Sequence, residues 1–175
     1  MPAPRLWRNN PLGDSLPEFE NAKSINTRIT GSTRHWQASS VFTKHPALMG
    51  VIASQLAHAL EGATIDYLTA EVSESTGYVD VLVFAGERIV WTRSTEDDGL
   101  PSTRIVNIDQ IESVELMHVP NLLSGSWGAS DRLTVVVAID GTDFTLPADD
   151  GATSANVAQL GAYLPALLSR FAPVS

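Results

Sequence analysis

Four histidines are the only side chains in this sequence that could offer a metal ion a soft nitrogen ligand, because the chain has no cysteine. They are His35, His45, His58 and His118. No two of them stand in the H-x-x-x-H or H-E-x-x-H spacing that presents two imidazoles on one helix face. We expect His58 to be exposed on a helix and His118 to be half buried at the end of a strand. The histidines therefore predict no metal site.

Carboxylates are the next groups that could do chemistry. The runs Glu96–Asp98 and Asp149–Asp150 lack the alternating spacing of a calcium loop and flank glycines, so we interpret them as solvated turn acids. Asp66, Glu71 and Asp80 could meet across adjacent strands, as acids on any strand pair can. The chain has no G-x-S-x-G, P-loop or G-x-G-x-x-G motif, so the sequence predicts no catalytic residue and no cofactor-binding residue.

One loop, Pro120–Gly128, places large apolar residues among residues that cannot form a core themselves. It contains Leu122, Leu123 and Trp127. These three side chains form a predicted partner-binding contact, since tryptophan often dominates interfaces. The other interpretation, which we favour, is that the loop folds over its own domain and buries Trp127 there.

Charge is distributed unevenly along the 175 residues, whose net charge is −9. Residues 1–45 hold six Lys/Arg and three Asp/Glu, whereas residues 46–175 hold five Lys/Arg and 17 Asp/Glu. The acidic body argues against non-specific nucleic-acid binding. We expect the positive arm to pack on the acidic body of the same or a neighbouring chain, with Trp7 and Trp36 at least partly buried. No stretch is predicted to be a targeting signal or membrane span, which favours a cytoplasmic location.

The sequence divides into an extended N-terminal arm over residues 1–42 and one domain over residues 43–175. The arm is rich in Pro, Asn, Ser and Thr. The domain begins with a helix over 46–61, whose apolar face recurs every three or four residues and whose end is marked by Gly62. The apolar residues of that face are Leu48, Ile52, Leu56 and Ala59.

A β-rich core follows over residues 63–147, where the apolar period changes to two. The predicted strands are 64–73, 78–85, 88–94, 103–108, 111–118, 131–139 and 143–147. Asp140-Gly141 suits a type I′ hairpin turn and Gly86-Glu87 a type II′ turn. The connections between strands are too short for helical crossovers, which predicts an antiparallel sandwich or small barrel.

The last predicted element is an amphipathic helix over 153–171, capped by Thr153 or Ser154 and bent at Pro165. Its apolar face is Val157, Leu160, Leu164, Leu167 and Phe171.

Seven strands followed by one amphipathic helix resemble bacterial pleckstrin-homology-like (PH-like) and GRAM-type domains. The resemblance covers about residues 63–172. It includes an apolar–aspartate–X–apolar–X–X–Val step, here Ile108-Asp109-Gln110-Ile111-Glu112-Ser113-Val114. The resemblance implies an α+β fold: a seven-stranded sandwich or barrel closed by the C-terminal helix, with the helix at 46–61 and the arm added.

The resemblance also implies a function, namely a non-catalytic binding or scaffolding module with a protein partner or self-association and no cofactor. The family's best-known ligand is a phosphoinositide head group, held by Lys and Arg around the first hairpin. Here that hairpin carries Glu71 and Glu74 and no base, so we expect no phosphoinositide or membrane binding. The alternative function is a small-molecule-binding barrel or an enzyme with an acidic, partly apolar cavity.

Overall fold

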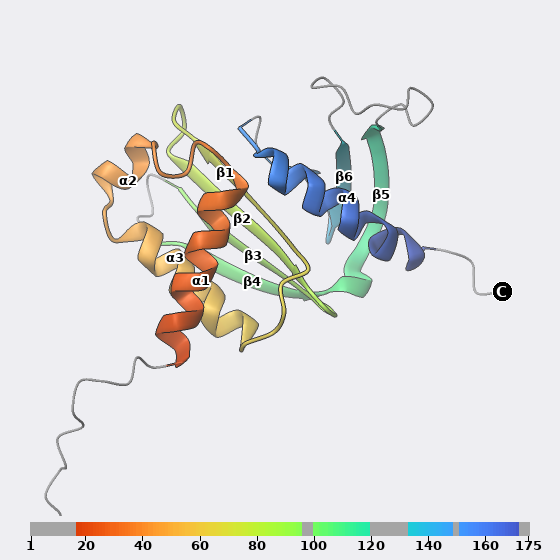
Figure 1. Cartoon of the computed structure of the whole chain (residues 1–175), viewed down its shortest axis with the longest axis horizontal. Helices are drawn as coiled ribbons and strands as arrows, with labels where there is room; N and C mark the ends of the chain where they lie inside the picture. The colour runs from red at the N-terminus through yellow and green to blue at the C-terminus, as the bar shows by residue number, and fades with distance from the viewer. Residues whose placement is uncertain (1–16, 96–99, 120–132, 149–150, 172–175) are drawn as a thin grey trace, which may run out of the picture.

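The computed structural model describes residues 17–95, 100–119, 133–148 and 151–171, and these form an α+β fold with two antiparallel sheets (Figure 1). The four-stranded sheet has the order β1 (Tyr67–Ser73), β2 (Tyr78–Ala85), β3 (Arg88–Ser94) and β4 (Ser102–Asn107). The three-stranded sheet has the order β5 (Ile111–His118), β6 (Thr134–Ile139) and β7 (Thr142–Leu146). Every predicted strand is present, with ends that differ from the predicted ones by a few residues.

The extended conformation predicted for residues 1–42 is wrong where the structure has two helices in this segment. Residues Pro17–Ser32 form helix α1, and Ser40–Lys44 form the short helix α2. The apolar residues Ile25 and Ile29 are one helical turn apart and are both buried. Trp36 is fully buried, as predicted, whereas Trp7 lies outside the described residues. This segment therefore forms part of the core instead of an arm.

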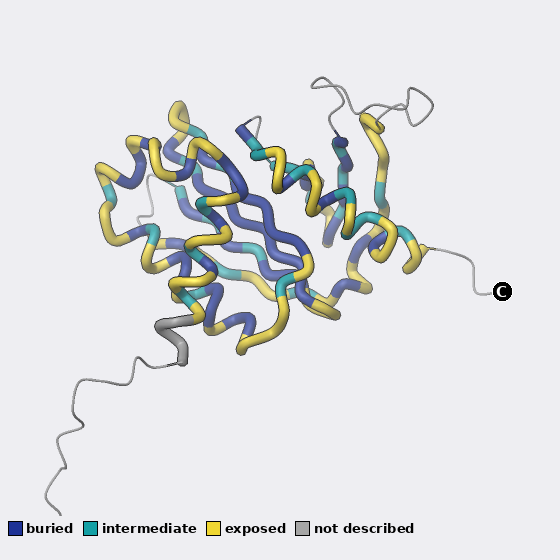
Figure 2. Tube along the Cα trace, in the orientation of Figure 1, coloured by how far each residue is buried: buried dark blue, intermediate teal, exposed yellow. Residues whose placement is uncertain are grey.

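One face of the four-stranded sheet packs against α1 and against helix α3 (Leu48–Leu60). The strands turn small and branched residues to this face, and the predicted apolar stripe of α3 is buried on it, which confirms that helix. The residue after the helix, Glu61, is its C-cap and has a left-handed φ of 51°. Figure 2 shows β1 to β3 buried beneath the helices. The apolar cluster contains Ile25, Ile29, Trp36, Ile52, Leu56, Leu68, Ala70, Val72, Val79, Val81 and Val83, among others.

The opposite face of the same sheet meets the three-stranded sheet and helix α4 (Ser154–Ser169). At one end of this face the strands supply large apolar side chains, and a second apolar cluster fills the space between the layers. That cluster includes Tyr67, Phe84, Ile89, Val135, Val137, Leu146, Leu160 and Leu167. Towards the β1–β2 hairpin the residues on this face become polar.

Helix α4 is held on the sheet by a buried polar anchor. Asn156 is 1 % exposed; its Nδ2 donates to the Leu68 carbonyl (2.6 Å), and its Oδ1 accepts from the Tyr67 hydroxyl (3.1 Å). Of the two predicted caps, Thr153 is the N-cap of α4. Its hydroxyl oxygen accepts a hydrogen bond from the main-chain N–H of Asn156. Pro165 lies inside the helix, and Phe171, predicted on the apolar face, is exposed.

Tight turns and one short helix order the strands. Asp140 and Gly141 both have positive φ (49° and 72°), as the predicted type I′ turn requires, and Gly86 has a φ of 58°. The 3₁₀ helix η1 (Ile108–Gln110) carries the chain from one sheet to the other, where Ile108 is buried. Among the described strands, β4 is not paired with β5 and β1 is not paired with β7, so the sheets do not join into one closed sheet.

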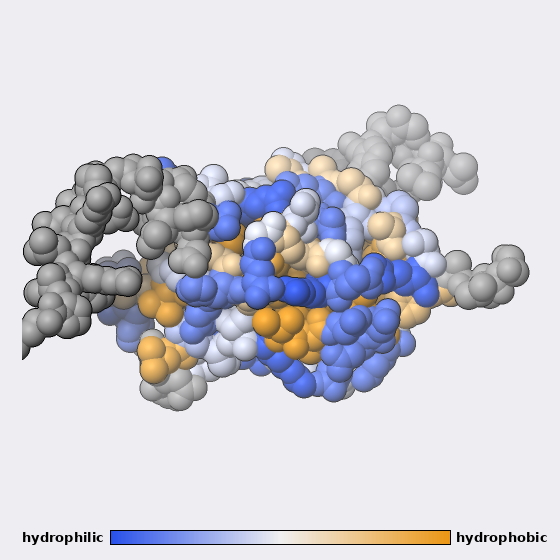
Figure 3. Space-filling view, turned by 90° about the horizontal axis from the view of Figure 1, so that it is seen from below, coloured by the Kyte–Doolittle hydropathy of each residue, from blue (hydrophilic) through white to orange (hydrophobic). Residues whose placement is uncertain are grey.

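The described surface is mixed in character. Viewed from below, a hydrophilic band crosses the face, with separate apolar patches beside it (Figure 3). Within the described residues, no helix has the length and apolar character needed to cross a membrane. The exposed large apolar side chains are Val51, Leu100, Ile105, Leu116, Met117, Val119 and Phe171.

Candidate functional site

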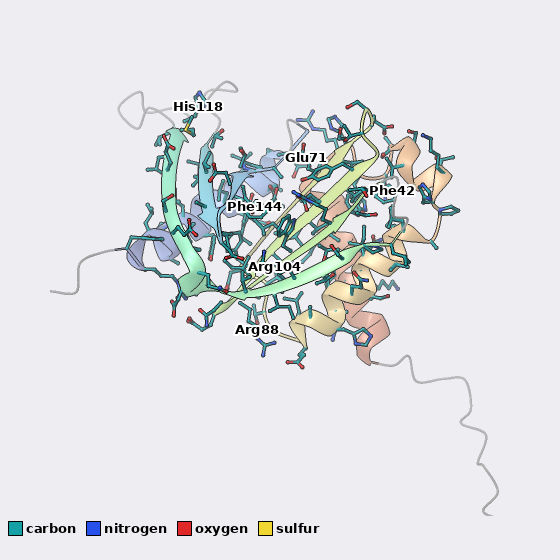
Figure 4. All side chains as sticks on the ribbon, turned by 180° about the vertical axis from the view of Figure 1, so that it is seen from behind. Phe42, Glu71, Arg88, Arg104, His118 and Phe144 are labelled. Atoms are coloured by element: carbon teal, nitrogen blue, oxygen red, sulfur yellow. The ribbon has the colours of Figure 1, made fainter. Side chains whose placement is uncertain are left out.

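A cavity of about 290 Å³ lies where the polar end of the four-stranded sheet faces β7. Figure 4 shows Glu71 near the β1–β2 hairpin and Phe144 between the two sheets. We call this cavity the inter-sheet cleft. Its described lining residues are Thr69, Glu71, Tyr78, Asp80, Leu82, Arg93, Asp143, Phe144, Thr145 and Ala148.

Strand register brings the charged groups of the cleft together. Asp80 on β2 is the direct cross-strand partner of Glu71 on β1 and of Arg93 on β3. Tyr78 precedes Asp80 by two residues and therefore points to the same face. Trp91 precedes Arg93 in the same way. Three neighbouring strands thus place acids, a base and two aromatic rings on one patch of the sheet.

Asp80 is the centre of a hydrogen-bonded network, although it is only 8 % exposed. Its Oδ1 accepts from the Trp91 indole, and its Oδ2 accepts from the Tyr78 hydroxyl and, at 2.9 Å, from Arg93 Nη2. The same Nη2 donates to the Tyr78 hydroxyl oxygen at 2.9 Å. Both carboxylate oxygens are therefore satisfied, as a buried charge requires.

The Arg93 guanidinium also lies over two aromatic rings. Its central carbon is 4.4 Å from the Trp91 ring centroid and 4.9 Å from that of Tyr78, which is cation–π geometry. Burial alone would lower the pKa of Arg93, but the hydrogen bond and negative charge of Asp80 outweigh it and raise that pKa. Burial and Asp80 raise the pKa of Tyr78. The base stays charged and the phenol stays neutral across the physiological range.

The other wall of the cleft is strand β7. Asp143, Phe144 and Thr145 all line it, although successive strand residues point to opposite faces. The cleft is therefore bordered by the main-chain edge of β7. Phe144 packs edge-on against Trp91, with centroids 4.8 Å apart, and the Ala148 amide donates to Thr69 Oγ1 at 2.9 Å.

The structure brings together two of the three acids that the sequence placed on adjacent strands. Glu71 and Asp80 are cross-strand partners, whereas Asp66 lies at the other end of the sheet and accepts from the Gly86 amide at 2.7 Å. Glu74 lies in the β1–β2 turn, where hydrogen bonds from Ser40 and Ser39 lower its pKa.

All four histidines lie in the part of the chain that the structure describes. His58 is exposed, as predicted. His118 is exposed too, so its predicted half-burial is wrong: the end of β5 is uncovered on both faces in the described structure. Among the described residues, no group of three or more His, Asp or Glu side chains could hold a metal ion.

The predicted partner contact, Leu122, Leu123 and Trp127, lies outside the described residues, as do the acid runs Glu96–Asp98 and Asp149–Asp150. Sequence reasoning missed Tyr78, Trp91 and Arg93. The available signal was an aromatic residue followed two positions later by a charged residue, Tyr78 and Asp80 in strand 78–85 and Trp91 and Arg93 in strand 88–94.

Comparison with known protein families, curated proteins and solved structures finds no match to this chain.

Proposed function

We propose that this chain is a non-catalytic binding module of PH-like type, and that its ligand site is the inter-sheet cleft. The observation that carries the proposal is the Asp80–Arg93–Tyr78–Trp91 network at the wall of a cavity. Charged groups are rarely placed between two layers of a small domain unless they are paired or used. The order of a four-stranded sheet, a three-stranded sheet and a C-terminal helix supports the PH-like part of the proposal.

The chemistry of the network favours binding over catalysis. A general acid or base needs a pKa near the working pH. The pKa values of Tyr78 and Arg93 are both raised further from neutrality, and both Asp80 oxygens already accept hydrogen bonds. These groups suit the positioning of a ligand instead.

We infer that the ligand is a segment of a protein, in the cytoplasm of a bacterium. Leu116, Met117 and Val119 at the end of β5 are 44 %, 50 % and 53 % exposed. They directly precede Leu122, Leu123 and Trp127 in the sequence, which supports an additional apolar contact with a partner there.

A small molecule is the second candidate ligand, and the size of the cleft favours it. At about 290 Å³ the cavity is near the lower end of small-molecule sites.

A titration followed by amide NMR tests the proposal and separates the candidates. Isotope-labelled full chain is titrated with pools of extended peptides and, separately, with pools of polar metabolites. We expect a peptide pool to shift the amides of residues 69–71, 78–82, 91–93 and 143–145, and Arg93→Met to abolish the shifts.

Arg88→Met is the matched control, because Arg88 is on the same strand but lies at the opposite end of the sheet from Glu71, where it pairs with exposed Glu61 (Figure 4). Shifts caused by metabolites alone would favour the second candidate. Shifts confined to other surfaces, or no shifts, would show that the cleft is not a ligand site.

A further inference from the structure

Strand β7 directs main-chain groups that no other described strand pairs with toward the inter-sheet cleft. The two-residue turn at Asp140-Gly141 makes Ile139 and Thr142 a hydrogen-bonded pair. Such pairs alternate with non-hydrogen-bonded pairs in an antiparallel ladder, so Phe144 and Leu146 also point their main-chain groups toward β6. Asp143 and Thr145 therefore direct their N–H and C=O groups away from β6.

This outward edge has the geometry for an added strand. In the described sheet β7 pairs with β6 alone, and its outer side borders the cleft. An extended peptide placed there would pair with Asp143 and Thr145 and would lie over the polar patch of the four-stranded sheet. Every second side chain of that peptide would point into the cleft.

The charges of the cleft determine which peptide suits it. The described lining residues include three acids, Glu71, Asp80 and Asp143, and one base, Arg93. Because the described lining carries more acids than bases, a peptide that inserts a basic side chain complements the charge of the cleft.

The chain itself contains such a peptide. Residues 5–10 (RLWRNN) lie between Pro4 and Pro11 and contain no proline, so each of them has the N–H that strand pairing requires. Arg5 and Arg8 are three residues apart and therefore point to opposite faces of a strand. Whichever face of the segment is turned inward, one arginine enters the cleft. This segment lies outside the described residues.

The connection to α1 favours the segment of another copy. The six residues 11–16 leave seven Cα–Cα steps between Asn10 and Pro17, the first residue of α1, and these steps span at most about 25 Å. Helix α1 covers one face of the four-stranded sheet and β7 lies over the other face. Layers stack about 10 Å apart, so the direct path through the sheet already takes about 20 Å, and a path around its edge is longer.

We propose that residues 5–10 of one copy of this chain pair with the outer edge of β7 of a second copy, with an arginine inserted into the inter-sheet cleft. This inference rests on the proposed function of the cleft and names its occupant. The partner copy contributes residues to the site, and the exchange links copies of the chain.

The test compares the full chain with two variants by sedimentation and by residue-resolved amide exchange. Arg5→Glu/Arg8→Glu reverses the charges of the inserted segment. Lys23→Glu/Arg34→Glu makes the same change of net charge on exposed residues of the described part and is the control. We expect a concentration-dependent oligomer for the wild type and the control, and a monomer for Arg5→Glu/Arg8→Glu.

Amide exchange locates the contact. In the oligomer the Asp143 and Thr145 amides should exchange about tenfold or more slowly than in the Arg5→Glu/Arg8→Glu variant. The Phe144 and Leu146 amides, which point toward β6, should exchange slowly both in the oligomer and in the Arg5→Glu/Arg8→Glu variant. A second variant, Thr145→Pro, removes one outward N–H and should also give a monomer.

A monomeric wild type, or an oligomer that survives Arg5→Glu/Arg8→Glu, would overturn the inference. Slow Asp143 and Thr145 exchange in a monomer would also overturn it, since the segment would then bind its own chain. If the inference fails but other peptides still shift the cleft amides, the proposed function stands; if no ligand shifts them, both are wrong.

Discussion

Asp80 and Arg93 are direct cross-strand partners on β2 and β3, and Arg93 Nη2 lies 2.9 Å from Asp80 Oδ2. The carboxylate is almost completely buried, whereas the guanidinium keeps 39 % of its side-chain surface exposed. The two partners therefore contribute unequally to stability. Loss of Arg93 leaves a buried charge without its cation, while loss of the Asp80 charge leaves a cation that water can still reach.

A double-mutant cycle measures this pair. We expect Arg93→Met to lower the free energy of unfolding by about 1–3 kcal/mol and Asp80→Asn by less, because the amide retains part of the hydrogen bonding. The double variant should lose about 0.5–2 kcal/mol less than the sum of the single losses. Urea unfolding provides all three values. Strict additivity would mean that the pair is not coupled.

Arg88→Met is the control for the same strand. The ion pair of Arg88 with Glu61 is exposed on both sides, so its loss should change stability by no more than about 0.5 kcal/mol. A loss as large as that of Arg93→Met would indicate that the substitution disturbs β3 in general.

The three tyrosines should resist ionisation in the folded protein. Burial raises the pKa of Tyr163 to about 12, and burial also raises the pKa of Tyr67 and Tyr78 above their usual value of 10.0. Between pH 10 and these raised values the unfolded chain loses protons that the folded chain keeps. The free energy of unfolding should therefore be unaffected by these tyrosines below pH 10 and fall as pH rises above it.

Ultraviolet absorbance near the tyrosinate band measures this directly. At about pH 11, one unit above the usual tyrosine pKa, the native protein should show little tyrosinate and the urea-unfolded chain should be mostly ionised. Full ionisation of a still-folded chain at that pH would contradict the buried positions of these rings.

Local chemistry explains why most elements were predictable. The Asp140-Gly141 turn and the Thr153 cap depend on a few neighbouring residues. The strands are visible in their two-residue alternation. Helix α1 was missed because Ile25 and Ile29 are isolated among polar residues, so its apolar face is narrow. Its burial depends on the sheet surface, which appears only once β1 to β3 have formed.

The candidate site was harder to predict for a different reason. Alternation indicates which residues of a strand share a face, but it does not indicate which residues of two strands lie side by side. The pairing of Asp80 with both Glu71 and Arg93 depends on the register of two hairpins. The approach of β7 depends on the packing of a second sheet, and no short sequence pattern encodes that contact.

The described hairpin supports the prediction that the protein does not bind anionic lipid. Glu74 is held by the Ser40 amide at 2.9 Å, and Glu71 lines the cleft, so two carboxylates are fixed near the β1–β2 turn. Carboxylates repel a phosphate group. In a vesicle sedimentation assay with phosphoinositide-containing liposomes at physiological salt, we expect no saturable binding. Saturable binding would mean that another surface supplies the bases.

The burial of Trp36 predicts that the N-terminal helices unfold together with the sheets. Its side chain is 0 % exposed and packs on Phe42, with ring centroids 4.7 Å apart, in the same cluster as Ile29. Trp36→Ala should therefore lower the free energy of unfolding by about 3–5 kcal/mol in a single transition. Urea unfolding followed by circular dichroism measures this without relying on tryptophan fluorescence.

Leu100→Ala is the control. It truncates a side chain that is 75 % exposed and should change the free energy of unfolding by about 0.5 kcal/mol or less. An unchanged midpoint for Trp36→Ala, or a separate early transition, would show that residues 17–44 are an appendage and not part of the core.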